Sequence, residues 1–252
     1  MNIATSLLTG VLISSAAAYL GTLMLGRRMA LVAGPLGHLT LPGIALALMY
    51  GFDVTLGAFP FVILGIVLIW LFEVRTKLPV EALTAIVFAT GVAAAFLFLP
   101  IEQAEAALVG DIAMVGTFDL ILTAVLSAII FSIVTKNYRK LLLTSISEDL
   151  ARVQGINSKK HNLIYLTMVA IVVALGVKLV GGLMTAALVA IPACSARNLS
   201  RNLLQDRLLA IGFGVGSCML GIVLSQISGH PAGVLIILIN AAIFVMTAVF
   251  KR

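Results

Sequence analysis

The stretch Met29–Leu48, MALVAGPLGHLTLPGIALAL, decides how the rest of the chain is interpreted. It is apolar enough to lie within a bilayer, yet it contains a histidine, His38. An ionisable side chain at bilayer depth is costly and marks a functional candidate. Helix-loosening residues surround the histidine, namely Gly34, Pro35, Pro42 and Gly43. Because such residues are tolerated where the backbone lines a cavity or packs against protein, we predict that they break the helix and line a pore around His38.

Composition and segment length indicate an all-α, polytopic membrane protein. The chain has 252 residues, of which 62% are hydrophobic and 10% are charged, whereas soluble domains contain about 25% charged residues. Nine segments approach the length of about 20 apolar residues that spans a bilayer. They are Ile3–Leu25, Met29–Tyr50, Thr55–Phe72, Val80–Leu99, Phe118–Thr135, Leu163–Val180, Gly181–Ala196, Leu208–Ile227 and Pro231–Phe250. The seventh is short and begins with two glycines, so eight spans are the alternative. We expect one transmembrane domain over residues 1–252.

Basic residues predict the orientation of the spans, because cytoplasmic loops are enriched in Lys and Arg. With nine spans and the N-terminus outside, 15 of the 16 Lys and Arg residues fall on the cytoplasmic side, and the C-terminus is cytoplasmic. The exception is Lys178, which falls outside. The net charge of +6 therefore reports topology rather than nucleic-acid binding. Five acids also fall outside, namely Asp53, Glu102, Glu105, Asp111 and Asp119. We expect them to favour cations at the outer face.

The longest inner loop, residues 136–162, is predicted to contain a short amphipathic helix. An N-cap, two acids for the first turn and a C-terminal stop are present at Ser147, Glu148, Asp149 and Gly155, in that order. Leu150 and Val153 would share one face of this helix. From this pattern alone the helix is either a docking element for a cytoplasmic partner or a lipid-facing or solvated loop helix.

Motifs of the common enzyme classes are missing from the sequence. It contains no GxxxxGK[ST] phosphate loop, no HExxH and no GxSxG. His38, His161 and His230 fall at different depths, which disfavours a catalytic cluster. We expect His161 to be a solvated loop residue, and His230 to be either a helix-cap residue before Pro231 or a ligand at an outer gate. Imidazole is a common ligand of borderline metals such as zinc. His38 is therefore either a metal ligand in a permeation path or a hydrogen-bonded structural group.

Four stretches together resemble the integral-membrane permease of bacterial zinc, manganese and iron ABC importers. GRRMALVAGPLGHLTLPGIALAL, residues 26–48, is similar to that family's basic turn followed by DALxHxxLPG. SISEDLARVQGI, residues 145–156, is similar to its cytoplasmic DxxLAxxxG loop. KLVGGLMTAALVAIPACSARNLSR, residues 178–201, is similar to VGxLLxxALLxIPAAxAR, and SGHPAG, residues 228–233, to its outer PxG turn. The order and spacing agree over nearly the whole chain.

The resemblance implies a permease that works as a homodimer in the cell (inner or plasma) membrane and itself binds no cofactor. Separate ATP-binding subunits would dock on its inner face, and an extracytoplasmic binding protein would deliver zinc, manganese or iron. The metal would pass near His38, with His230 as a candidate ligand at the outer gate. The short inner helix would then couple the permease to the ATPase. Its coupling residues would be Ser147, Glu148, Asp149, Leu150, Arg152 and Gly155.

One position departs from the family pattern. The family commonly has an aspartate four residues before the histidine, which places a carboxylate and an imidazole about one helical turn apart. Here that position is Gly34, so the expected metal transit site rests on His38 alone. Two alternatives remain open. One is a permease of the same architecture for a metal chelate or a vitamin, and the other is a carrier or channel that works without an ATPase.

Overall fold

The computed structural model describes residues 3–26, 33–76, 78–98, 110, 115–182 and 185–250. Within these residues the chain folds into helices joined by turns and loops, without strands. The helices are α1 (Ile3–Gly26), α2 (Ala33–His38), α3 (Leu41–Tyr50), α4 (Val54–Thr76), α5 (Val80–Phe98), α7 (Thr117–Ile146), α8 (Glu148–Val153), α9 (Ser158–Val180), α10 (Thr185–Leu199), α11 (Leu203–Ser228) and α12 (Ala232–Val249). The predicted all-α fold is confirmed.

In the described part of the chain, seven helices are long and apolar enough to cross a membrane: α1, α4, α5, α7, α9, α11 and α12. The two other predicted spans are also helical but differ in form. Met29–Tyr50 corresponds to the pair α2 and α3, and Gly181–Ala196 corresponds to α10, which has 15 residues. Each of the nine apolar segments therefore contains helix. Met29–Tyr50 is divided into two helices, and Gly181–Ala196 forms a short one.

Several helices, among them α7 and α9, extend beyond the apolar segments that predicted them. α7 continues to Ile146, and α9 begins at Ser158, with the side chain of Asn157 as its N-cap. The expectation that His161 is solvated was wrong, because its side chain is buried and its Nδ1 atom lies 2.9 Å from the carbonyl oxygen of Asn157. Hydropathy alone ended α7 too early and began α9 too late, since a helix can extend from an apolar into a polar segment.

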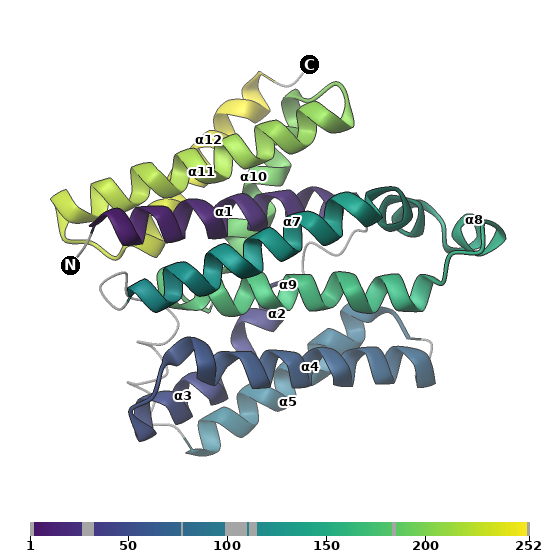
Figure 1. Cartoon of the computed structure of the whole chain (residues 1–252), viewed down its shortest axis with the longest axis horizontal. Coiled ribbons are helices and arrows are strands. Elements are labelled where there is room, and N and C mark those ends of the chain that lie inside the picture. Colours follow the sequence, from purple (N-terminus) through teal and green to yellow (C-terminus); the bar gives the residue numbers. More distant parts are fainter. Residues whose placement is uncertain are drawn as a thin grey trace.

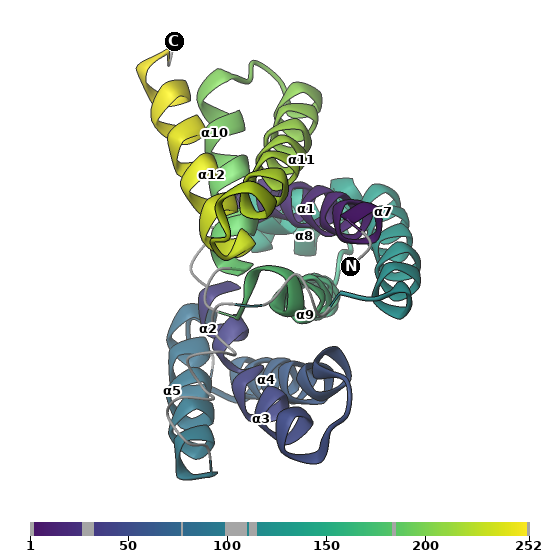
Figure 2. The ribbon, with the colours of Figure 1, turned by 90° about the vertical axis from the view of Figure 1, so that its left-hand side faces the viewer.

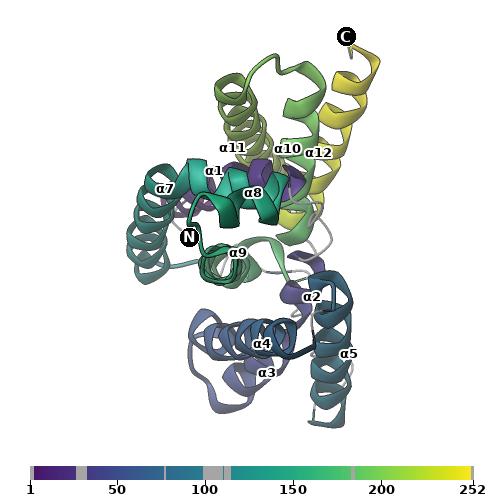
Figure 3. The same ribbon diagram turned by 90° about the vertical axis from the view of Figure 1, so that its right-hand side faces the viewer.

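α9 lies at the centre of the molecule. In Figure 1 it runs between the layer of α1 and α7 and the group of α3, α4 and α5. Figures 2 and 3 show that α10, α11 and α12 gather on the side of α9 away from that group. The central position explains the burial of α9. In its most apolar 18-residue stretch 72% is buried, compared with 28% in that of α5. Contacts with α9 therefore position the elements on both sides of it.

The N-terminus and the short helix α8 lie at opposite ends of the molecule. In Figure 1 the N-terminus lies at the same end as the first residues of α7, whereas α8 lies at the opposite end. The predicted topology requires this separation, because it places the N-terminus outside and α8 inside. Which of these ends faces the cytoplasm stays a prediction.

Candidate functional site

A break separates α2 from α3 directly after His38. α2 ends at His38 and α3 begins at Leu41. Pro42 has no backbone N–H, so it cannot donate the helical hydrogen bond to the carbonyl oxygen of His38, four residues earlier. The hydroxyl of Thr40 instead donates to the carbonyl oxygen of Gly37 at 2.5 Å. The predicted helix break is therefore present, and the carbonyl oxygen of His38 receives no helical hydrogen bond from residue 42.

A second break lies between α9 and α10. α9 ends at Val180, and Gly181 follows with φ of 90°, in the region that favours glycine. Next to it, the backbone of Gly182 lies directly against α2. A Cβ atom added to Gly37 would lie 2.0 Å from the carbonyl oxygen of Gly182. The two breaks thus meet one residue away from His38, in contact that only glycines permit. Discontinuous helices whose broken ends face each other are the form that substrate sites take in many transporters.

The imidazole of His38 is half-buried and lies against α5. Its ring centroid is 5.1 Å from that of Phe88, and the two rings are tilted by 50°. No group of three or more His, Cys, Asp or Glu side chains that could hold a metal ion is found in the part of the chain that the structure describes. Within one copy and these residues, the expected transit site therefore consists of His38 alone.

Gly34 has room for a side chain. A Cβ atom added there would lie 3.8 Å from the Cβ atom of Ala186 on α10, an ordinary van der Waals contact. The backbone around position 34 therefore accommodates a Cβ atom as it stands, and the glycine there leaves no carboxylate one turn before His38.

The other residues predicted at the break have different surroundings. Gly34 and Pro35 are half-buried on α2. Pro42 lines an apolar groove of about 640 Å³ between α3, α4 and α5. Gly43 is buried, and a Cβ atom there would lie 2.0 Å from the carbonyl oxygen of Gly57 on α4, so the glycine allows α3 and α4 to approach closely. His230 is exposed in the turn between α11 and α12, where its carbonyl oxygen accepts from the hydroxyl of Ser225.

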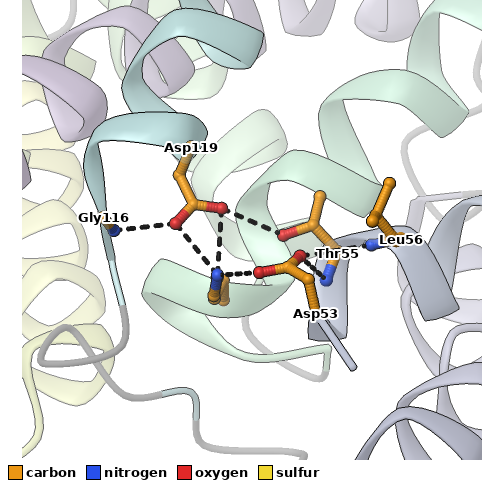
Figure 4. Close-up of polar contacts among 6 residues, drawn as sticks. Asp53, Thr55, Leu56, Gly116 and Asp119 are labelled. Atoms are coloured by element: carbon orange, nitrogen blue, oxygen red, sulfur yellow. Dashed lines mark hydrogen bonds and ion pairs between the residues drawn. The ribbon is translucent and has the colours of Figure 1, made fainter. Parts of the chain in front are cut away.

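A buried ion cluster joins three helices at the end of the molecule opposite α8, and the sequence did not reveal it. The Nζ atom of Lys178 on α9 lies 2.5 Å from Asp53 and 2.9 Å from Asp119 (Figure 4). The side chains of Lys178 and Asp119 are each 9% exposed, and that of Asp53 is 27% exposed. Of the acids predicted outside, Glu102, Glu105 and Asp111 lie outside the described residues. The prediction that Lys178 and the two aspartates share one side of the membrane is consistent with their contact.

Both aspartates of this cluster also cap helices. Asp53 accepts from the backbone N–H of Thr55 at 2.8 Å and of Leu56 at 3.3 Å, at the start of α4. Asp119 accepts from the backbone N–H of Gly116 at 2.8 Å, at the start of α7. Partial burial raises the pKa of the Asp53 carboxyl. The hydrogen bond and charge of Lys178 and the two backbone N–H groups outweigh that effect and hold the pKa below its ordinary value of 3.8.

The short inner helix forms as predicted. The Ser147 hydroxyl accepts from the backbone N–H of Leu150 at 3.3 Å. Gly155 ends the helix with φ of 72°, and the N–H of the next residue returns to the carbonyl oxygen of Ala151. Ala151 is buried, whereas Leu150 and Val153 are 54% and 87% exposed. Asp149 and Arg152 are exposed as well, and Glu148 is the first residue of α8. The helix therefore presents two uncovered apolar side chains with charges beside them.

Long apolar helices, two facing helix breaks and an exposed amphipathic helix define a multi-pass membrane protein of the transporter class. Comparison with known proteins makes the class specific. Residues 1–251 match the model of the ABC 3 transport family. The chain therefore belongs to the ABC 3 transport family, whose members are membrane permeases, and the resemblance recognised in the sequence is confirmed.

Named relatives and a solved structure agree with this assignment. The chain is 31% identical to the "High-affinity zinc uptake system membrane protein ZnuB" of Haemophilus influenzae, over 98% of this chain and 96% of that protein. It is 24% identical to the "Manganese transport system membrane protein MntC" of Listeria monocytogenes, over 97% of this chain and 89% of that protein. Its fold is similar to that of PsaBC from Streptococcus pneumoniae in complex with Fab. The TM-score is 0.84 at 23% identity, over 98% of this chain and 91% of that one.

Proposed function

We propose that this chain is the permease of an ATP-driven importer that moves a divalent transition-metal ion, zinc, manganese or iron, across the cell membrane. It would work as a homodimer with separate ATP-binding subunits and an extracytoplasmic binding protein. The observation that carries the proposal is the meeting of two helix breaks beside His38. That site lies in a chain whose relatives are named for zinc and manganese transport. ATP and the metal would both be transient partners, one on the ATPase and one in the path.

His38 would act as a weak, transient ligand. A single imidazole beside a helix break binds a divalent cation loosely, and loose binding suits conduction because a tight site retains the ion. In a homodimer the second copy would bring a second His38, so two imidazoles would be available along the path. His230, exposed in the turn between α11 and α12, would be an outer gate ligand in this proposal.

α8 would carry the motion of the ATPase into the membrane. Its exposed pair Leu150 and Val153 suits insertion into an apolar groove of a partner, since an amphipathic helix binds through such an apolar face. The backbone of α8 is fixed at both ends, by the Ser147 cap and the Gly155 stop, so that a push on the helix is transmitted rather than absorbed. This placement requires the end of the molecule that carries α8 to be cytoplasmic.

Metal-resolved uptake tests the proposal. The chain is reconstituted in vesicles with and without a co-expressed ATP-binding subunit. Zinc, manganese and iron uptake are then followed separately, with ATP and with a non-hydrolysable analogue. We expect uptake of at least one bare metal ion, and only with the ATPase and ATP present. Uptake without the ATPase would instead support a carrier or channel. ATP-dependent uptake of a chelate but of no bare ion would support the chelate permease.

A further inference from the structure

The cluster around Lys178 lies three residues before the α9–α10 break. The ammonium group contacts Asp53 at 2.5 Å and both carboxylate oxygens of Asp119, at 2.9 and 3.0 Å (Figure 4). Three contacts match the three N–H donors of a lysine. Asp119 also accepts from the hydroxyl of Thr55 at 3.4 Å. The cluster therefore ties the last turn of α9 to the first turns of both α4 and α7.

Each charge in the cluster also suits the helix end that carries it. Asp53 and Asp119 lie at helix N-termini, where negative charge is favourable, and Lys178 lies in the last turn of α9, where positive charge is favourable. Because the cluster is largely buried, its contacts are screened little by water. Removing one member would leave an uncompensated charge, which is strongly destabilising. The end of α9 is thus held in place relative to two other helices.

The end of α9 that Lys178 holds is followed at once by the α9–α10 break, which contacts α2 beside His38. Val180 closes the helix, and its carbonyl oxygen lies 2.5 Å from where a Cβ atom of Gly233 on α12 would be. Gly182 follows two residues later and touches Gly37 of α2 backbone to backbone. His38 is the next residue along α2. Four residues of chain and one backbone contact therefore connect the Lys178 ammonium group to His38.

We infer that Lys178 is a positioning residue, which through its ion pairs with Asp53 and Asp119 holds the α9–α10 break against α2 and so sets the place of His38. The inference rests on the proposed function, since only there does His38 have a role. The ion cluster of Lys178, Asp53 and Asp119 then has a role beyond folding. The cluster does not bind the metal but keeps the two breaks in contact.

The structure supplies a reporter for that contact. Position 34 on α2 and Ala186 on α10 place their Cβ atoms 3.8 Å apart, which is the Cβ separation found in disulfides. In a background with Cys194→Ala and Cys218→Ala, the pair Gly34→Cys and Ala186→Cys is oxidised with copper phenanthroline in native membranes. The rate of the intramolecular disulfide then measures how well α10 is held against α2, and it needs neither metal transport nor ATP hydrolysis.

The test compares Lys178 variants in this reporter. Lys178→Met should slow disulfide formation at least about tenfold, because the two ion pairs are lost and two carboxylates remain unpaired. The matched control is Asn162→Leu, which removes the amide contacts at 2.8 and 2.9 Å to Glu73 and so loosens the same helices, α9 and α4, at their other ends. It should change the rate by no more than about twofold, since distant sites act independently.

A neutral variant keeps the inference testable if Lys178→Met does not accumulate. Lys178→Met combined with Asp53→Asn and Asp119→Asn leaves no buried charge unpaired, and asparagine still caps both helices. This variant should fold and still form the disulfide slowly. A parent-like rate in the folded neutral variant would overturn the inference. Metal uptake by the parent chain is measured separately, so that failure of the positioning role of Lys178 is distinguished from failure of the proposed transport.

Discussion

The contact between Gly37 and Gly182 yields the sharpest prediction, which is that Gly37→Ala fails where Gly34→Ala is tolerated. A Cβ atom at position 37 would lie 2.0 Å from the carbonyl oxygen of Gly182 and 3.0 Å from its carbonyl carbon. Real Cβ atoms essentially never approach a neighbour closer than 3.0 Å. One backbone must therefore retreat by at least about 1 Å, and no side-chain rotation can relieve the clash.

The magnitude follows from comparing two alanines on the same short helix. Both substitutions gain the same helix propensity, about 1 kcal/mol. Only the one at position 37 adds an overpacking cost, about 1–3 kcal/mol. At position 34 the new methyl group meets Ala186 at 3.8 Å, an ordinary contact. Gly37→Ala should therefore be about 1–3 kcal/mol less stable than Gly34→Ala, and it should move His38 away from the α9–α10 break.

The assay measures both stability and transport in the two variants. The fraction of protein that stays monodisperse after heating in detergent reports stability, and ATP-dependent metal uptake in vesicles reports the site. We expect Gly34→Ala to equal or exceed the parent in heat resistance, and Gly37→Ala to fall below Gly34→Ala in both measurements. Equal heat resistance and equal uptake in the two alanine variants would refute the claim that the helix breaks meet through these glycines.

Three further predictions follow from other parts of the molecule. Gly34→Asp should lower the KM for divalent-cation uptake, because it adds a carboxylate one turn before His38 in a place with room for it; an unchanged KM would count against a metal path there. Leu150→Ser with Val153→Ser should leave folding intact, since both side chains are exposed, but should abolish permease-stimulated ATP hydrolysis; normal stimulation would remove the coupling role of α8. The depressed pKa of Asp53 adds stability that is present above its unfolded value and is lost as pH falls through its folded value. Heat resistance should therefore drop below about pH 4, and Asp53→Asn should flatten that drop.

Much of the scaffold follows from the sequence because hydropathy and local signals are properties of short segments. All nine apolar segments contain helix. The Ser147 cap and the Gly155 stop act within one or two turns, and both were placed correctly. Pro42 predicted the break after His38 for the same reason, since the lost hydrogen bond is a local effect. The burial of His161, in contrast, was not predicted, because it depends on how α9 packs in the fold.

The features that position the site come from tertiary contacts and escaped the sequence. Lys178 and Asp53 are 125 residues apart, and the sequence indicated only that they share a side of the membrane. Gly37 and Gly182 each look like ordinary helix-breaking glycines, and their partnership is visible only once α2 lies against α9 and α10. Sequence therefore identifies the imidazole, whereas the fold identifies what holds it.

Metal uptake by His38→Ala, in vesicles that contain the ATP-binding subunit and ATP, shows whether the imidazole takes part in transport. The amount of inserted, monodisperse permease is matched to the parent in each preparation. We expect normal insertion with strongly reduced initial rates of zinc and manganese uptake, because the imidazole beside the two helix breaks is lost. Unchanged uptake of both metals at equal permease content would contradict it.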